Sequence, residues 1–178
     1  MSRVLDRNRA ALVVIDVQEA FRKAVDGFDE AARQCATLVS GARVLGLPVL
    51  VTEQYPRGLG ATVEEVAAAL GDTPRIEKLV FSACRADGFD LGGRDQALVC
   101  GVETHVCVNQ TVEDLLDAGV EVHVVADAVA SRSRANRELG LHKMEGSGAV
   151  VSSVETALLE LVGAAGNDEF KAIQKLIL

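Results

Sequence analysis

Three side chains of this sequence could together perform nucleophilic chemistry: Cys107, Asp16 and Lys78. Cys107 follows an apolar run and Gly101, and the apolar spacing after it predicts a helix that begins at the cysteine. A helix N-terminus favours the thiolate, which is the nucleophilic form, and its backbone N–H groups can bind an oxyanion. The alternative is that Cys107 is a small hydrophobic core residue, as many free cysteines are.

Asp16 and Lys78 are charged residues inside apolar runs, where an ionised side chain needs a partner. Asp16 could instead cap a loop, and Lys78 could face solvent from an edge strand. If the three side chains meet, Lys78 lowers the pKa of the thiol. Asp16 then takes the thiol proton and returns it to a leaving amine.

The elements that must position these residues alternate along the chain. The predicted strands cover residues 10–17, 48–52, 75–81, 96–100, 120–126 and 149–151, and the predicted helices cover 29–45, 62–70, 107–118, 134–144 and 154–162. In helix 62–70, Thr62 is the expected N-cap and Glu65 completes a capping box. This order predicts an α/β fold, with three layers (α/β/α) around an open, mostly parallel, six-stranded Rossmann-like sheet. We expect residues 1–178 to form one domain, with its site at the carboxyl ends of the strands.

Composition excludes several classes of function. The net charge of −8 and the lack of basic runs argue against nucleic-acid binding. No apolar run approaches the roughly 20 residues of a membrane span, and the first nine residues contain no signal-peptide segment. The four cysteines show no CxxC spacing, so we expect reduced thiols in a cytoplasmic protein.

Several motifs in order make the chain similar to the isochorismatase-like cysteine hydrolases, over about residues 9–161. The motifs are Ile15-Asp16-Val17-Gln18, the run that contains Lys78, Gly101-Val102-Glu103-Thr104-His105-Val106-Cys107-Val108, Asp127-Ala128 and Ser131-Arg132-Ser133. The segment Glu53-Gln54-Tyr55-Pro56, followed by Gly58-Leu59-Gly60, resembles the branch of small isochorismatase domain-containing proteins.

The resemblance implies that Asp16, Lys78 and Cys107 form a catalytic triad. It also implies a cis peptide bond between Val102 and Glu103, with an oxyanion hole made by the backbone N–H groups of Glu103 and Cys107. Isochorismatases that hydrolyse a vinyl ether do not need a cysteine nucleophile. The presence of Cys107 therefore favours a small non-peptide amide or related acyl substrate, hydrolysed through a thioester. The rival hypothesis is a non-catalytic interaction or scaffold protein on the same fold. A redox thiol protein is a third, with Cys84 or Cys100 as the resolving cysteine.

Side chains near the predicted strand ends suggest a substrate pocket made by Phe21, Tyr55 and His105. No metal or other cofactor is expected. Zinc-binding relatives use an aspartate and histidines after the second strand, whereas residues 53–61 here contain no histidine.

The tail, residues 167–178, has an amphipathic helical pattern with Phe170, Ile173, Leu176 and Ile177 on one face. This face could pack on its own domain or on another subunit. The resemblance favours a homo-oligomer, either a dimer or a tetramer.

Overall fold

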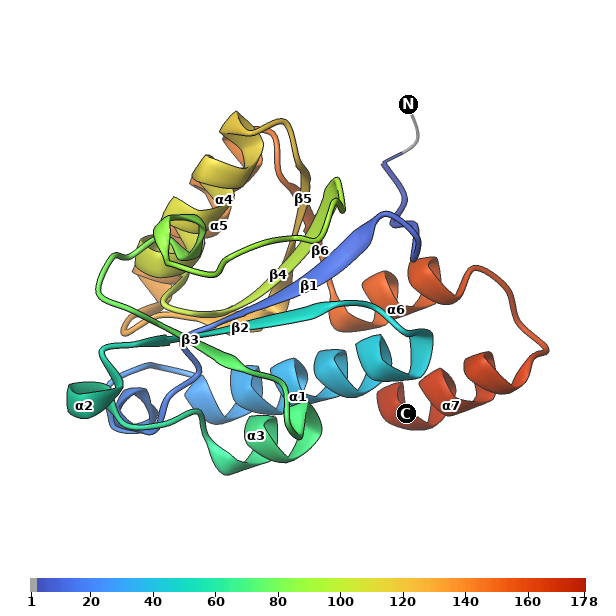
Figure 1. Ribbon diagram of the computed structural model, residues 1–178, viewed down its shortest axis with the longest axis horizontal. Helices are drawn as coiled ribbons and strands as arrows, with labels where there is room; N and C mark the ends of the chain where they lie inside the picture. The colour runs from blue at the N-terminus through green and yellow to red at the C-terminus, as the bar shows by residue number, and fades with distance from the viewer. Residues whose placement is uncertain (1–2) are drawn as a thin grey trace.

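A six-stranded, all-parallel sheet lies between two layers of helices in the computed structural model, which describes residues 3–178 (Figure 1). The first two residues of the expected domain lie outside that range. The strand order is β3-β2-β1-β4-β5-β6. The strands are β1 (Ala10–Ile15), β2 (Val49–Gln54), β3 (Arg75–Lys78), β4 (Gln96–Val102), β5 (Glu121–Ala130) and β6 (Val150–Ser152). The helices are α1 (Phe28–Leu45), α2 (Pro56–Leu59), α3 (Glu64–Leu70), α4 (Asn109–Asp117), α5 (Arg134–Gly146), α6 (Val154–Val162) and α7 (Asp168–Ile177), with short turns at Glu19–Lys23, Ala83–Arg85 and Thr104–Val108.

The two faces of the sheet carry separate apolar cores. Helices α1, α3, α6 and α7 cover one face, and α4 and α5 cover the other (Figure 1). Every residue of β1 and β4 is buried, as expected for central parallel strands whose sequences are almost continuously apolar. The predicted three-layer α/β fold is therefore confirmed.

Two strands, β1 and β3, end earlier at their carboxyl ends than the sequence predicts. β1 ends at Ile15 because Asp16 has a positive φ of 51°, a conformation that an extended strand cannot contain. β3 ends at Lys78, which lies opposite Gln54, the last residue of β2, so no strand is left to pair with the residues that follow. The predicted strand over residues 75–81 is wrong in its last three positions, and Leu79 is 76% exposed.

Helix α3 begins two residues later than predicted. Both the backbone N–H and the hydroxyl of Thr62 donate to Glu53, at 2.8 and 2.6 Å, and Thr62 lies one residue before the N-cap position. Val63 occupies the N-cap position without a side-chain bond, and Glu65 pairs with Arg22. The predicted capping box is therefore wrong, because the N-cap position falls on Val63 and Glu65 pairs with Arg22.

Gly101 allows β4 to approach β1 closely. A Cβ atom at this position would lie 2.0 Å from the carbonyl oxygen of Ile15, and the φ of Gly101 is +121°. Only glycine satisfies both conditions. This approach places the chain after β4 beside the residue that follows β1.

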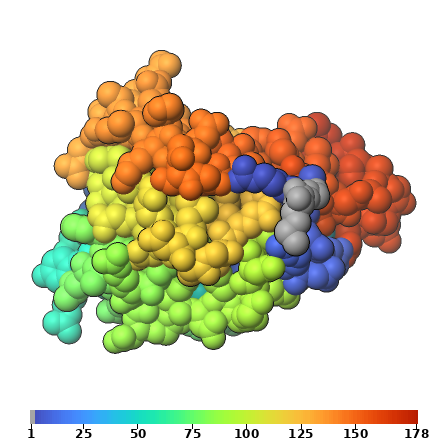
Figure 2. Space-filling model, turned by 90° about the horizontal axis from the view of Figure 1, so that it is seen from above, coloured from blue at the N-terminus to red at the C-terminus, as the bar shows by residue number. Residues whose placement is uncertain are grey.

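The predicted helical tail is α7, and its apolar face packs back on the same chain. Ile173 is fully buried, and Phe170, Leu176 and Ile177 pack against the core formed with α1 and α6. Figure 2 shows α7 (red) at one end of the molecule, near the N-terminal segment (blue), to which an ion pair between Arg7 and Glu169 joins it. Within residues 3–178, no helix is long and apolar enough to cross a membrane.

Candidate active site

The three predicted catalytic side chains lie at the carboxyl ends of three strands. Asp16 follows β1, Lys78 is the last residue of β3, and Cys107 lies in the turn Thr104–Val108 that follows β4. β1 and β4 are neighbours, but β2 separates β1 from β3, so the three strands are not all adjacent. The side chain of Lys78 therefore reaches past the end of β2. All three residues are buried, with at most 5% of their surface exposed.

Asp16 and Lys78 form a fully buried ion pair. Lys78 Nζ donates to Asp16 Oδ2 at 2.6 Å, and the Thr52 hydroxyl donates to Asp16 Oδ1 at 2.7 Å. Both side chains are 0% exposed, so the alternative of a solvent-facing Lys78 is wrong. A buried carboxylate is tolerated only when its oxygens have donors, and here each oxygen of Asp16 has one.

Three polar residues without a predicted role complete this cluster: Thr52, Gln54 and Gln18. Lys78 Nζ donates to Gln54 Oε1 at 2.7 Å. Gln18 is fully buried and accepts from the backbone N–H of Gln54 at 2.7 Å. Thr52 and Gln54 lie at the end of an apolar strand, and Gln18 lies two residues after Asp16. Gln18 and Gln54 also lie within the motifs that carry the family resemblance, but the sequence assigns a role to none of the three.

Cys107 lies in a wide helical turn, Thr104–Val108, which joins β4 to α4. The backbone N–H of Val108 donates to the carbonyl of Glu103 at 3.2 Å, an i to i−5 bond of the kind found at functional sites. The peptide bond between Val102 and Glu103 is cis. Gly140 of α5 packs on the backbone of the turn, where a Cβ atom would lie 3.0 Å from Thr104 and His105. The turn is thus held by β4 on one side and by α5 on the other.

The pKa of the Cys107 thiol is raised to about 12, first by burial and then by the negative charge of Asp16. Lys78 lowers the pKa, as the sequence predicts, but by less than burial raises it. The net shift of this pKa is therefore upward, although the predicted helix start and Lys78 both favour the thiolate. Its cause is desolvation, which sequence position alone does not report.

Glu103 anchors the Cys107 turn to the loop after β5. Its carboxylate accepts from Arg132 at both oxygens, at 3.0 and 2.7 Å, and from the Arg132 backbone N–H at 3.0 Å. The hydrogen bond from Arg132 lowers the pKa of Glu103, so this carboxylate is charged and paired. Arg132 is consequently part of an ion pair at the edge of the site.

The three predicted pocket residues do not line one common hollow. Tyr55 lines a hollow of about 380 Å³ together with Arg57, Glu77 and Leu79. Phe21 packs against the core beside α1, and Nδ1 of His105 lies 3.0 Å from the hydroxyl of Ser131.

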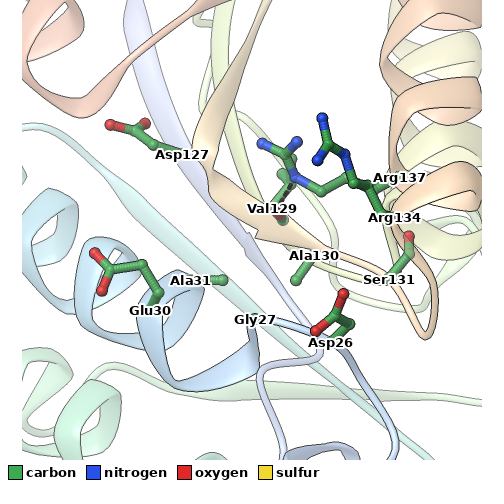
Figure 3. Close-up of a pocket in the computed structure, with 10 residues that line it drawn as sticks. All are labelled: Asp26, Gly27, Glu30, Ala31, Asp127, Val129, Ala130, Ser131, Arg134 and Arg137. Carbon is green, nitrogen blue, oxygen red and sulfur yellow. Dashed lines mark hydrogen bonds between the residues drawn. The ribbon is translucent and has the colours of Figure 1, made fainter.

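Ser131 in turn lines a second hollow, of about 280 Å³, between α1, β5 and α5. In Figure 3 the carboxylates of Asp26, Glu30 and Asp127 surround it from one side, and the guanidinium groups of Arg134 and Arg137 lie on the other. This hollow includes none of the three triad side chains.

Glu53, near the end of β2, lies at the edge of the segment where zinc-binding relatives are expected to carry their ligands, and it has other partners. Glu53 uses one carboxylate oxygen to accept two hydrogen bonds from Thr62. Among residues 3–178, no three histidine, cysteine, aspartate or glutamate side chains are grouped so that they could hold a metal ion.

Sequence comparison places this site in a family. Residues 10–156 match the family model described as Isochorismatase domain, so the chain belongs to the isochorismatase family. It is 44% identical over 176 residues to the Secreted isochorismatase effector Isc1 of Phytophthora sojae, covering 94% of this chain and 84% of that protein. It is 41% identical over 180 residues to Isochorismatase domain-containing protein 2A of Mus musculus, covering 99% and 86%.

Solved structures show the same fold. The MAR1 ribonuclease of Caenorhabditis elegans superposes with a TM-score of 0.92 at 39% identity, covering 98% of this chain and 92% of that one. The YcaC gene product of Escherichia coli, described as an octameric hydrolase of unknown specificity, superposes with a TM-score of 0.89 at 26% identity, covering 99% and 90%.

Proposed function

We propose that this isochorismatase-family protein is a cysteine hydrolase of a small non-peptide amide or related acyl compound. The observation that carries the proposal is the buried Asp16–Lys78 ion pair, whose charges both act on the Cys107 thiol. An ionised pair in a nearly dry position is expensive and perturbs the nucleophile beside it, which is typical of catalytic sites. The rival function, a scaffold without catalysis, could use the ion pair for stability but does not need a thiol beside it.

The raised pKa of Cys107 sets the order of the proton transfers. Because the free thiol is neutral, Asp16 takes the Sγ proton as Sγ attacks the substrate carbonyl carbon. The carbonyl oxygen becomes an oxyanion, which the backbone N–H groups of Glu103 and Cys107 bind. Asp16 then gives the proton to the leaving amine, the C–N bond breaks and a thioester remains. Water attacks the thioester with Asp16 as base, which releases the acid and restores the thiol.

The enclosure of the site supports a small substrate. Cys107 is only 5% exposed, so a bulky chain does not reach its sulfur in this conformation. The C. elegans relative is named a ribonuclease. In this chain, the net charge of −8 disfavours binding of a polyanion such as RNA. The four cysteines are all free thiols, which fits the cytoplasmic location that we propose.

A substrate panel tests the proposal directly. The protein is mixed with small primary amides, carbamoyl compounds and thioesters, acid release is followed, and rapidly quenched samples are analysed by intact mass. The proposal predicts turnover of at least one compound and an added acyl mass on the peptide that contains Cys107. Turnover with no acyl adduct in any quenched sample, together with full activity after Cys107 has been blocked by an electrophile, would reject the thioester route.

We predict that hydrolysis needs no metal. Glu53 already binds Thr62, and the loop after β2 supplies no histidine. Dialysis against a strong chelator should leave the rate of acid release unchanged, and elemental analysis should find less than stoichiometric zinc. Activity that is lost on chelation and restored by zinc, but not by magnesium, would refute this prediction.

We also propose that the chain forms a homo-oligomer, either a dimer or a tetramer. The E. coli relative is described as octameric. In this chain an apolar patch lies beside the site end of β3: Tyr55, Leu79, Val80 and Phe81 are 43–76% exposed. Adjacent exposed apolar side chains of this size are typical of interfaces.

Light scattering at micromolar concentration should therefore give a mass of two or four chains. Leu79→Asp should shift that mass toward the monomer, because it places a charge in the contact. Leu139→Asp is the matched control, since Leu139 is 62% exposed on α5, outside the patch. A monomeric wild-type protein would contradict the proposal, and an equal response of the two variants would exclude this patch as the contact.

A further inference from the structure

The ammonium group of Lys78 has more acceptors around it than it has hydrogens. Nζ lies 2.6 Å from Asp16 Oδ2, 2.7 Å from Gln54 Oε1 and 2.9 Å from the Phe81 carbonyl, with the Val80 carbonyl at 3.3 Å. A lysine ammonium has three N–H donors, so the three nearest acceptors use all of them. A further group that needs one of these hydrogens must displace an acceptor.

The Cys107 sulfur is the group that needs a hydrogen once it becomes a thiolate. The positive charge of Lys78 lowers the pKa of this thiol. Asp16 is the charged partner of Lys78, and Phe81 contributes a backbone carbonyl. Gln54 contributes a neutral side-chain amide, so it is lost at a lower electrostatic cost than the Asp16 carboxylate, and among the neutral acceptors it is the one that a substitution can remove.

Gln54 is held in place independently of Lys78. The buried Gln18 side chain accepts from its backbone N–H at 2.7 Å and donates to its backbone carbonyl at 3.0 Å. The Gln54 amide nitrogen donates to the carbonyl of Leu79 at 2.9 Å. With these contacts in place, the amide oxygen of Gln54 has a fixed position beside the ammonium.

We propose that Gln54 is a positioning residue that competes with Cys107 for one hydrogen of Lys78. In the unliganded protein Gln54 accepts this hydrogen, and the thiol stays protonated. When Asp16 takes the thiol proton, the ammonium hydrogen turns from the Gln54 oxygen to the sulfur. This inference rests on the proposed function, but its effect on the thiol exists without any substrate.

Two substitutions of the same residue should move the thiol in opposite directions. Gln54→Met removes the competing oxygen and leaves only the distant Val80 carbonyl, at 3.3 Å, to compete with the thiolate for the third ammonium hydrogen, so it lowers the pKa of Cys107. Gln54→Glu adds a second carboxylate beside Lys78 and raises the pKa. Both variants lose the amide N–H of Gln54 that donates to the Leu79 carbonyl, so any loosening of the segment after β3 is common to both. The other buried carboxylates at this edge, Glu53 and Glu103, keep their partners in both variants.

The experiment measures the alkylation of Cys107 by iodoacetamide against pH, resolved by peptide mass spectrometry. Relative to wild type, we expect the rate at Cys107 to rise about tenfold in Gln54→Met and to fall about tenfold in Gln54→Glu, since one pKa unit is a tenfold change in thiolate. Cys84, which lies outside the ion-pair cluster, is the internal reference in every sample. Gln174→Glu is the matched control, because it adds the same charge on the exposed surface of α7. Thiolate absorbance against pH gives the same pKa without a reagent that must enter the buried site. For each protein it is taken as the difference from the same protein with Cys107→Ala added.

A shift of both Gln54 variants in the same direction, or no shift in Gln54→Met, would overturn the inference. A lower pKa of Cys107 in Gln54→Met together with a higher one in Gln54→Glu would support it. Because no substrate is used, the result is separate from the proposed hydrolysis. If the two Gln54 variants shift the pKa of Cys107 as expected but Cys107→Ala still hydrolyses substrate, the role of Gln54 stands and Cys107 is rejected as the nucleophile.

Discussion

Cys107→Ala should reduce turnover of any true substrate by at least about a thousandfold, because it removes the atom that forms the thioester. Acid release is measured with the best compound of the panel, and the acyl adduct seen by intact mass should disappear. The thiol is buried among apolar residues of the α4 and α5 face of the sheet, so the smaller alanine side chain should leave the fold in place. The melting curve of the variant checks this.

Cys107→Ser provides a control of similar size. Its hydroxyl fits the same space but is a far weaker nucleophile than the thiol near neutral pH, so we expect a loss close to that of alanine. Cys84→Ala removes a thiol outside the cluster and should retain activity. Turnover by Cys107→Ala within about tenfold of wild type would show that water, rather than sulfur, attacks the substrate.

Lys78→Met should lower the free energy of unfolding by about 3–5 kcal/mol, since it leaves Asp16 as an unpaired buried carboxylate. Methionine keeps the length and apolar volume of the lysine stem, so the loss reports the charge. Urea denaturation measures it. The same substitution should raise the pKa of Cys107, because it removes the positive charge that lowers it.

The double variant Asp16→Asn/Lys78→Met separates stability from catalysis. It removes both charges, while asparagine still accepts from the Thr52 hydroxyl, so most of the lost stability should return while turnover stays absent. Arg134→Met breaks an exposed ion pair with Glu138 and should change stability little. If Lys78→Met unfolds no more easily than Arg134→Met, the buried pair does not carry the stability that its burial implies.

The layers of the fold could be predicted because β1 and β4 are apolar almost without interruption and their burial is complete. The residue at which β3 ends could not be predicted from the sequence. Leu79, Val80 and Phe81 continue the apolar pattern of a strand, yet they are exposed, and the carbonyls of Val80 and Phe81 turn toward the ammonium of Lys78. The contact between these carbonyls and the Lys78 ammonium therefore helps to decide where β3 ends, and the local sequence pattern does not predict that contact.

The triad could be proposed because charged residues in apolar runs are conspicuous. Thr52, Gln18 and Gln54 are neutral, and their roles depend on the register between β2 and its neighbours, which the sequence does not specify. The net direction of the pKa shift at Cys107 cannot be predicted from the sequence for a similar reason. Position near a helix start favours the thiolate, whereas the degree of burial, which outweighs it here, follows only from the packed structure.

The site is divided between two halves of the sheet that meet at the seam of β1 and β4. Asp16 and Lys78, 62 residues apart, both belong to the first half, which ends with β3, while Cys107 belongs to the second. During synthesis the acid–base pair leaves the ribosome before the nucleophile does. The thiol acquires its base only when β4 docks on β1 through Gly101. A molecule in which β4 has not paired with β1 therefore holds the proposed nucleophile apart from its proposed base.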